Sequence, residues 1–350
     1  MPDFKTPVQL SERYIILDFL RGFALLGICL ANYPEFSLYT FQSKEVTELM
    51  STAAIDKGIK YVQYIFIDGK IYTLFSLLFG IGFSIIISGY SYKNANGTYL
   101  FYRRMIVLLL IGLFHLIFLW AGDILILYAV LGLFLPLFRN IPDKKLLVYS
   151  VLLLLFPIVI ESCIVLFGWN LSAPVIKATH YFHTQFGITE ANFPVWLVEK
   201  SNYSDILRFN LAGSFIRIQE FIEGNRICKV LGLFLLGLYI GRNKMYADLE
   251  ANKRLLIKVR FYGLILGLPA SILYAWNIMN DNYLGVICGA VLYAVSVVPL
   301  SLAYISLICL WFIKNKESQL VKIIAAPGRM ALTNYIGQSV FGIFIFYGIG

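Results

Sequence analysis

The sequence predicts an all-α protein, built as a single polytopic transmembrane helix bundle over residues 1–350. The first observation is composition: 59% of the residues are hydrophobic, 14% are charged, and the mean hydropathy is +0.76. A soluble domain averages roughly 45–50% apolar and 25% charged residues. A soluble fold of this length has no interior large enough for the surplus apolar surface, so we expect that surface to face lipid.

The second observation is the length of the apolar runs. A helix needs roughly 20 mostly apolar residues to cross a hydrocarbon core about 30 Å thick, because it rises about 1.5 Å per residue. About nine spans meet this criterion, at residues 14–32, 71–90, 105–121, 124–138, 146–169, 228–241, 261–276, 284–313 and 330–350.

The third observation is the distribution of Lys and Arg. Residues 242–260 hold six of them, whereas the turns around Asp123 and Asn280 hold none. Because short cytoplasmic loops are enriched in these residues, we expect a protein integral to the cell membrane with its N-terminus in the cytoplasm. The net charge of +9 therefore indicates topology and a lipid bilayer partner, not a nucleic-acid surface.

Two longer connections, residues 34–70 and 170–227, are expected on the outer side with short interfacial helices. They either cover an outer cavity as a lid or connect spans without a functional role. Small residues at helical spacing, such as Gly237 and Gly241, predict close helix packing within the chain or, alternatively, a face for a homo-oligomer. The five cysteines lie in or at the edge of apolar runs without a CxxC pair, which is typical of core residues and not of metal ligands.

Asp18 and Arg21 are the first ionisable residues inside a predicted span. They are three residues apart, hence on one helix face and close enough to pair. The pair either anchors the helix near the inner interface, or Arg21 faces a central cavity and binds a phosphate or a developing oxyanion while Asp18 holds it in place.

His115 lies near the outer end of the third span and is one of three histidines in the chain. A neutral imidazole can move protons near pH 7, as a general base must, and the alternative is a buried histidine bonded to a backbone carbonyl. Asp123 begins the next helix. It either caps that helix or orients the His115 imidazole and stabilises its charged form.

Further polar residues occur at both depths of the predicted bundle. Asn32 and Glu161 fall in its outer half, whereas Arg329 and Asn334 lie near the inner end of the ninth span. Such a distribution fits a path between a cytosolic donor and an external acceptor. The chain carries no phosphate-binding loop, no dinucleotide fingerprint after a strand and no HExxH motif, so we expect no permanently bound cofactor and no metal.

Four ordered motifs resemble the YeiB-like bacterial membrane proteins, a family with a domain of unknown function (418). They are LDxxRGxA at residues 17–24, TLFSLLFG at 73–80, the GFxHxxxxWxGDILxxYxxxG pattern at 112–132 and GRMALTNY at 328–335. Leu113 stands where the third pattern has phenylalanine. The resemblance implies the bacterial inner membrane, and a tenth helix beyond Gly350.

The family is distantly similar, mainly in its first helix, to transmembrane acyltransferases such as heparan-α-glucosaminide N-acetyltransferase. Those enzymes pass an acyl group from cytosolic acyl-CoA to a sugar across the bilayer. Asp18 and Arg21 match the shared DxxRG element. The catalytic histidine that those enzymes carry after the first helix has no counterpart, because residues 34–70 contain no histidine.

The leading hypothesis is therefore a membrane-embedded acyltransferase that uses acyl-CoA as donor and a cell-envelope glycan or lipid as acceptor. In it Arg13, Arg21 and Arg329 face the donor phosphates or the thioester oxyanion, His115 deprotonates the acceptor, and Asp123 orients His115. The alternative from another class is a transporter or channel for a small molecule or lipid, without covalent chemistry. A third interpretation is a non-catalytic envelope protein.

Overall fold

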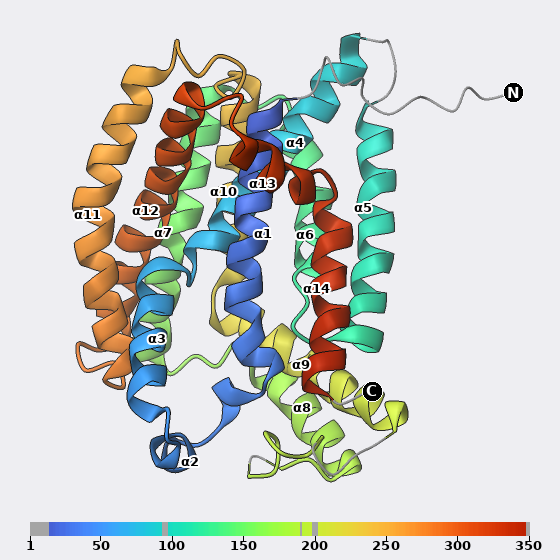
Figure 1. The fold of residues 1–350 in the computed structure, drawn as a ribbon. Helices are drawn as coiled ribbons and strands as arrows, with labels where there is room; N and C mark the ends of the chain where they lie inside the picture. The colour runs from blue at the N-terminus through green and yellow to red at the C-terminus, as the bar shows by residue number, and fades with distance from the viewer. Residues whose placement is uncertain (1–13, 93–96, 190, 198–201, 348–350) are drawn as a thin grey trace, which may run out of the picture.

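The computed structural model describes residues 14–92, 97–189, 191–197 and 202–347, and these form a helical bundle (Figure 1). The described residues contain no β-strand. The elements are α1 (Ile15–Phe36), η2 (Tyr39–Phe41), α2 (Lys44–Leu49), α3 (Ala53–Phe66), α4 (Lys70–Tyr92), α5 (Gly97–Phe114), η3 (His115–Leu119), α6 (Leu125–Phe134), η4 (Leu135–Phe138), α7 (Asp143–Phe167), α8 (Ala173–Phe186), α9 (Tyr203–Glu223), α10 (Arg226–Arg242), α11 (Lys253–Met279), α12 (Val286–Lys314), α13 (Gln319–Arg329) and α14 (Ala331–Phe346).

Within the described residues, six helical stretches are long and apolar enough to cross a membrane. They are Ile15–Phe36, Ala53–Ser88, Gly97–Leu119, Asp143–Phe167, Lys253–Met279 and Val286–Lys314, and two shorter apolar helices are Leu125–Phe138 and Ala331–Phe346. The predicted span at 228–241 corresponds to α10, which has 17 residues. The all-helical membrane bundle is thus confirmed, whereas the count of nine crossings and the side of the N-terminus stay predictions.

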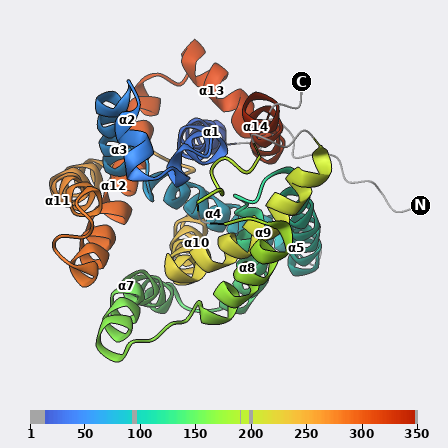
Figure 2. The same cartoon turned by 90° about the horizontal axis from the view of Figure 1, so that it is seen from below.

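The surface of the bundle is apolar where lipid is expected. On α7, apolar side chains with large exposed fractions follow one another along the helix, among them Val148, Val151, Leu152, Leu155 and Val159. A water-soluble helix would carry charged residues on such a face. Seen along the bundle, α1 and α4 lie side by side in the interior, with α11 at one edge and α5 at another (Figure 2).

Residues 34–70, which were predicted to form an outer connection with short interfacial helices, are largely helical. Its last part, α3, packs against α11 and exposes an apolar stripe at Ile55, Ile59, Val62 and Phe66. Together α3 and α4 form one stretch of 36 residues, Ala53–Ser88, interrupted between Phe66 and Lys70 about halfway along the bundle (Figure 1). We call this interruption, residues 67–69, the α3–α4 break.

At the α3–α4 break, backbone carbonyls at the end of α3 have no hydrogen-bond donor within the helix, and the apolar surroundings offer them no water. Side chains satisfy three of them: Lys70 Nζ donates to Tyr64 O at 2.7 Å, Ser271 Oγ to Ile65 O at 2.7 Å and Tyr304 hydroxyl to Phe66 O at 3.2 Å. Irregular backbone at membrane depth needs such partners. The break is therefore a fixed feature of the bundle.

Small residues let helices approach closely, as the sequence predicted. A Cβ on Gly22 of α1 would collide with the carbonyl of Ile324 in α13, and one on Gly328 of α13 would collide with the carbonyl of Asp18. The DxxRG and GRMALTNY motifs thus meet backbone to backbone. Gly80 of α4 and Gly237 of α10 form a second contact of this kind, so these small residues serve packing within one chain.

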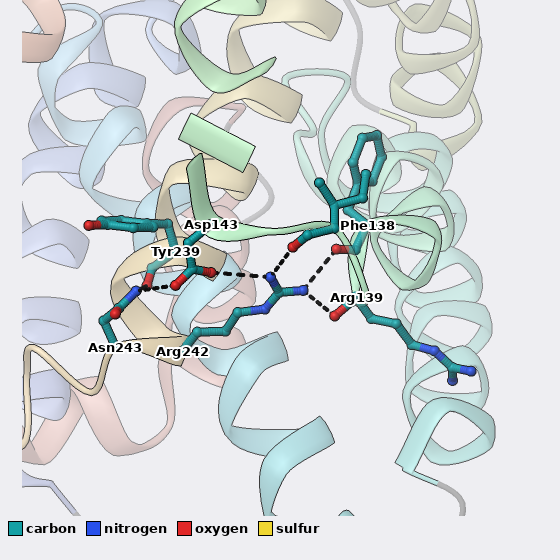
Figure 3. A network of polar contacts seen from close by, with 7 residues as sticks. Phe138, Arg139, Asp143, Tyr239, Arg242 and Asn243 are labelled. Carbon is teal, nitrogen blue, oxygen red and sulfur yellow. Dashed lines mark hydrogen bonds and ion pairs between the residues drawn. The ribbon is translucent and has the colours of Figure 1, made fainter. Parts of the chain in front are cut away.

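Arg242 at the end of α10 holds the turn between η4 and α7 (Figure 3). Its guanidinium donates to the carbonyls of Phe138 at 2.8 Å and Ile141 at 2.6 Å, and also to that of Arg139. Asp143 Oδ1 lies 3.4 Å from Arg242 Nη1. Because carbonyls at the end of a helix lack partners within it, this contact ties α10 to the α6–α7 connection.

Candidate functional site

A cavity of about 430 Å³ lies inside the bundle, and we call it cavity A. Its lining includes Arg21 of α1 and Arg104 of α5, both near the end of the bundle at which these helices begin (Figure 1). Asn32, Glu35 and Arg217 line it toward the other end of α1. The lining between these groups is mostly apolar, with Ile28, Phe75, Leu78, Phe83, Met105 and Leu108 among it. Cavity A thus combines polar groups at two ends with a largely apolar middle, to which Asp68 and Arg226 add two ionisable side chains.

The Arg21 guanidinium is held at cavity A by the predicted partner. Arg21 Nη1 lies 3.0 Å from Asp18 Oδ1, and Asp18 is 2% exposed. Both sequence interpretations of this pair are compatible with the geometry, because the contact anchors α1 and also fixes the side chain that lines the cavity. The backbone contact of Gly22 with α13 immobilises the same turn of α1.

Arg217 of α9 organises the opposite end of cavity A. Its guanidinium lies 3.0 Å from Glu35 Oε2 and 2.7 Å from Glu220 Oε2, and its Nε donates to Ala121 O at 3.3 Å. Burial opposes the charged form of Arg217, but Glu35 and Glu220 outweigh it, so its pKa is raised. Burial also raises the pKa of Glu220, which Arg217 lowers in part and Glu35 raises further.

His115 and Asp123 are in contact, and a serine completes the cluster. His115 Nδ1 lies 3.0 Å from Asp123 Oδ1, and His115 Nε2 lies 2.7 Å from Ser339 Oγ of α14. Asp123 Oδ2 also accepts the backbone N–H of Ile126 at 2.8 Å, so the two roles weighed for Asp123, helix cap and histidine partner, are both present. All three side chains of the cluster are at most 1% exposed.

The His115 cluster lies behind the wall of cavity A. Gly122 and Ile124 line the cavity on either side of Asp123, and Tyr335, whose ring is 5.2 Å from that of His115, lines it as well. Neither His115 nor Asp123 is among the residues lining cavity A or the second cavity described below. A general base must come within hydrogen-bonding distance of the acceptor proton, so the catalytic role of His115 stays a prediction.

A second cavity of about 620 Å³, cavity B, lies between α7, α10, α11 and α12. Carboxylates, amides, cations and tyrosines line it, among them Glu161, Asn225, Lys229, Tyr274, Tyr293 and Asn282. Glu161 Oε1 accepts from Asn225 Nδ2 at 2.7 Å. Asn225 occupies the turn between α9 and α10 with a φ of 52°, so a second helix interruption contributes to this cavity.

Three residues line both cavities: Asp68, Tyr72 and Arg226. Asp68 belongs to the α3–α4 break, Tyr72 to the first turn of α4 and Arg226 to the start of α10. Gly69 has a φ of +73°, and a Cβ there would lie 2.7 Å from the Tyr293 hydroxyl. Glycine therefore allows the chain to turn at the wall between the cavities.

The other predicted site residues are distributed as follows. Asn32 lines cavity A and Glu161 lines cavity B. Arg329 is exposed and lines neither cavity, while Asn334 Nδ2 donates to Pro327 O at 3.0 Å and Met330 O at 3.1 Å, across the junction of α13 and α14. Arg13 lies outside the described residues. The structure thus brings Arg21 and Asn32 to one cavity and separates them from the His115 cluster.

Asp68, Arg217, Arg226 and Ser339 were not predicted from the sequence. The first three lie in or beside stretches expected to be outer connections, and Ser339 is one hydroxyl in an apolar helix. Two of them could have been found from their position in the sequence. Asp68 directly precedes a glycine and an apolar run, and Arg226 and Lys229 stand at the start of a second apolar run. Within the described ranges, no group of three or more His, Cys, Asp and Glu side chains could hold a metal ion.

The chain is similar to known proteins over most of its length. Residues 240–350 match the family model "Protein of unknown function (DUF418)". The chain is 29% identical to "Uncharacterized protein YxaH" of Bacillus subtilis (strain 168) over 98% of this chain and 84% of that protein. It is 26% identical to "Uncharacterized protein YeiB" of Escherichia coli (strain K12) over 97% of this chain and 85% of that protein. No solved structure matches the chain.

Proposed function

This chain is a YeiB-like member of the DUF418 family, and we propose that it transfers an acyl group from an acyl-CoA donor held in cavity A to a cell-envelope acceptor. The single observation that carries the proposal is the lining of cavity A, which has Arg21 and Arg104 at one end and Asn32, Glu35 and Arg217 at the other. Its middle is largely apolar, with Asp68 and Arg226 as the exceptions. An acyl-CoA has the same order of anionic, extended and acyl parts.

The donor fits cavity A in one direction. Phosphates bind best to guanidinium groups, which donate several hydrogen bonds in a fixed plane, so the nucleotide end belongs at Arg21 and Arg104. The pantetheine arm and acyl group then occupy the apolar middle. The proposal places this end of the bundle in the cytoplasm of a bacterial cell, with about nine crossings of the inner membrane. The distribution of Lys and Arg and the bacterial origin of the relatives support that orientation and location.

The roles proposed for Asp18 and Asn32 are those expected from the sequence, whereas the role proposed for His115 and Asp123 differs. Asp18 positions Arg21 for the donor, and Asn32 lies where the acyl group would end. His115 and Asp123 form, with Ser339, a buried cluster that supports the wall of cavity A instead of taking the acceptor proton. Asn334 holds the α13–α14 junction, Arg329 lines neither cavity, and Glu161 belongs to cavity B.

The test is acyl-CoA binding and turnover by the purified protein in detergent. Arg104→Ala is expected to weaken acyl-CoA binding about ten-fold or more, because a charged hydrogen bond contributes roughly 1.5–3 kcal/mol. Arg103→Ala is the matched control, since Arg103 is an exposed neighbour that does not line cavity A. Equal binding by the two variants, or no acyl-CoA binding by the unaltered protein, would contradict the proposal.

Transport of a small molecule or lipid is the second candidate. The specific observation in its favour is the pair of helix interruptions, at 67–69 and at 224–225, beside cavities that share a wall. Many transporters build their substrate sites from such discontinuous helices. Flux of a labelled solute through reconstituted liposomes, without thioester cleavage, would favour transport over acyl transfer.

A further inference from the structure

We propose that cavity B binds the acceptor, a polyhydroxylated molecule of the carbohydrate class, and that Asp68 at the wall between the cavities takes the proton from its attacking hydroxyl. This inference rests on the proposed function and deepens it, since it assigns the second substrate and the base. No motif in the sequence singled out the lining of cavity B or Asp68.

The first argument is the shared wall. A transfer between two substrates requires both reacting groups to reach one point, and Asp68, Tyr72 and Arg226 are the residues common to the two cavity linings. A donor thioester in cavity A and an acceptor hydroxyl in cavity B can meet at these side chains. Proximity of this kind supplies a large share of the acceleration in two-substrate reactions.

The second argument is the state of the Asp68 carboxylate. Among the described residues, no hydrogen bond or ion pair engages this side chain, whereas Asp18 pairs with Arg21 and Asp123 with His115. An ionisable residue at mid-span costs roughly 2.5–3.5 kcal/mol on insertion scales and usually marks a function. Hydrogen bonds to the carbonyls of Tyr64 and Ile65 fix the backbone of the α3–α4 break. The Asp68 carboxylate is therefore held in position and is available to a substrate.

The third argument is the chemistry of the cavity B lining. Lys229 Nζ lies 3.8 Å from the centre of the Tyr293 ring, and the Tyr72 and Tyr293 hydroxyls are 2.9 Å apart. Glu161 uses one oxygen for Asn225 and keeps the other for a ligand. Carboxylates accept from sugar hydroxyls, Lys donates to them, and tyrosine rings cover the apolar faces of the sugar.

The reaction balances with these groups alone. The acceptor oxygen forms a bond to the thioester carbon while Asp68 accepts the hydroxyl proton. The negative charge that develops on the carbonyl oxygen is met by the Arg226 guanidinium, which lines both cavities. The carbon–sulfur bond then breaks, its electron pair leaves with sulfur, and Asp68 returns the proton to give the free thiol and an acylated sugar.

The experiment uses the full chain in detergent with labelled acetyl-CoA and separates donor binding from transfer. Asp68→Asn is expected to reduce transfer to methyl glucoside at least 100-fold and to leave acetyl-CoA affinity within two-fold. Glu161→Gln should raise the KM for methyl glucoside about ten-fold with little change in kcat. Asp56→Asn is the matched control, because Asp56 lies on α3, accepts from Thr52 and lines neither cavity.

The outcomes separate this inference from the function on which it rests. No acetyl-CoA binding by the unaltered protein overturns both. Binding and turnover that survive Asp68→Asn overturn this inference alone, as does a Glu161→Gln effect on the donor KM only. Acylation of methyl glucoside supports the inference with a free sugar as acceptor, and acylation of a glucosyl diglyceride in vesicles supports it with a lipid-linked sugar. Transfer to octanol but to neither sugar contradicts it. Partial recovery of activity in Asp68→Glu shows that loss in Asp68→Asn is not misfolding.

Discussion

Gly80 of α4 and Gly237 of α10 lie face to face, so that a Cβ built on either glycine would sit 3.0 Å from the Cα of the other. Each added methyl group would also run into a backbone carbonyl, that of Phe234 for Gly80 and that of Leu77 for Gly237. Backbone cannot yield as a side-chain tip does, so α4 and α10 would have to separate. These two helices carry Tyr72 and Arg226 of the wall between the cavities.

Gly237→Ala is therefore expected to destabilise the protein by about 2 kcal/mol, the usual cost of overpacking a tight contact. Thermal unfolding in detergent measures the change. Gly337→Ala is the control, because a Cβ there meets nothing within 4 Å, and alanine in a helix interior should gain roughly 0.5–1 kcal/mol. Equal unfolding temperatures for the two variants would show that the α4–α10 contact is looser than described.

Ser339→Ala is expected to cost about 1–3 kcal/mol of stability, because it leaves the buried His115 Nε2 without its partner at 2.7 Å. Acyl-CoA binding should be unchanged, since the cluster does not line cavity A. Ser162→Ala on α7 removes only a local bond to Ile158 O and should have a much smaller effect. Loss of turnover without loss of stability in Ser339→Ala would instead favour the original hypothesis that His115 is catalytic.

Glu220 contacts Arg217 at one end of cavity A, and its pKa predicts that the stability of the protein depends on pH. Burial raises its pKa above the ordinary 4.5, Arg217 lowers it in part, and Glu35 raises it again. With a raised native pKa, the folded state binds more protons than the unfolded one, so the contribution of Glu220 is fully present below 4.5 and is lost as pH rises through the native value. Glu220→Gln mimics the protonated form.

The unfolding temperature of Glu220→Gln relative to unaltered protein should therefore rise between pH 4 and pH 7. Thermal unfolding of both proteins at a series of pH values measures the difference. Glu48→Gln serves as control, because Glu48 is exposed and lies outside both cavities. A difference that is constant with pH would mean that Arg217 keeps Glu220 ionised throughout.

Much of the bundle could be predicted because its causes are periodic or local. Apolar runs of helical length, the Asp18–Arg21 pair three residues apart, and the small-residue ridges each follow from spacing along one helix. The contact of His115 with Asp123 was also anticipated, because the two are separated by a single short turn.

The wall between the cavities depends on contacts between distant parts of the chain. Residues 53–66 carry Asp56, Lys57 and Lys60, which favour an interfacial helix, yet the segment packs along α11 and continues into α4 through the break. Asp68 and Arg226 come from segments more than 150 residues apart, so no spacing rule could place them together. Ser339 meets His115 from 224 residues away.

The partners of the α3–α4 break bear on the order in which the protein is assembled. Two of the three donors, Ser271 and Tyr304, stand 206 and 238 residues after the carbonyls that they bond. Because proteins are synthesised from the N-terminus, these two carbonyls lack their side-chain donors until the last third of the chain has been made. Docking of α3 is therefore a late event in biogenesis, and a nascent chain halted before residue 304 holds this segment without its full set of bonds.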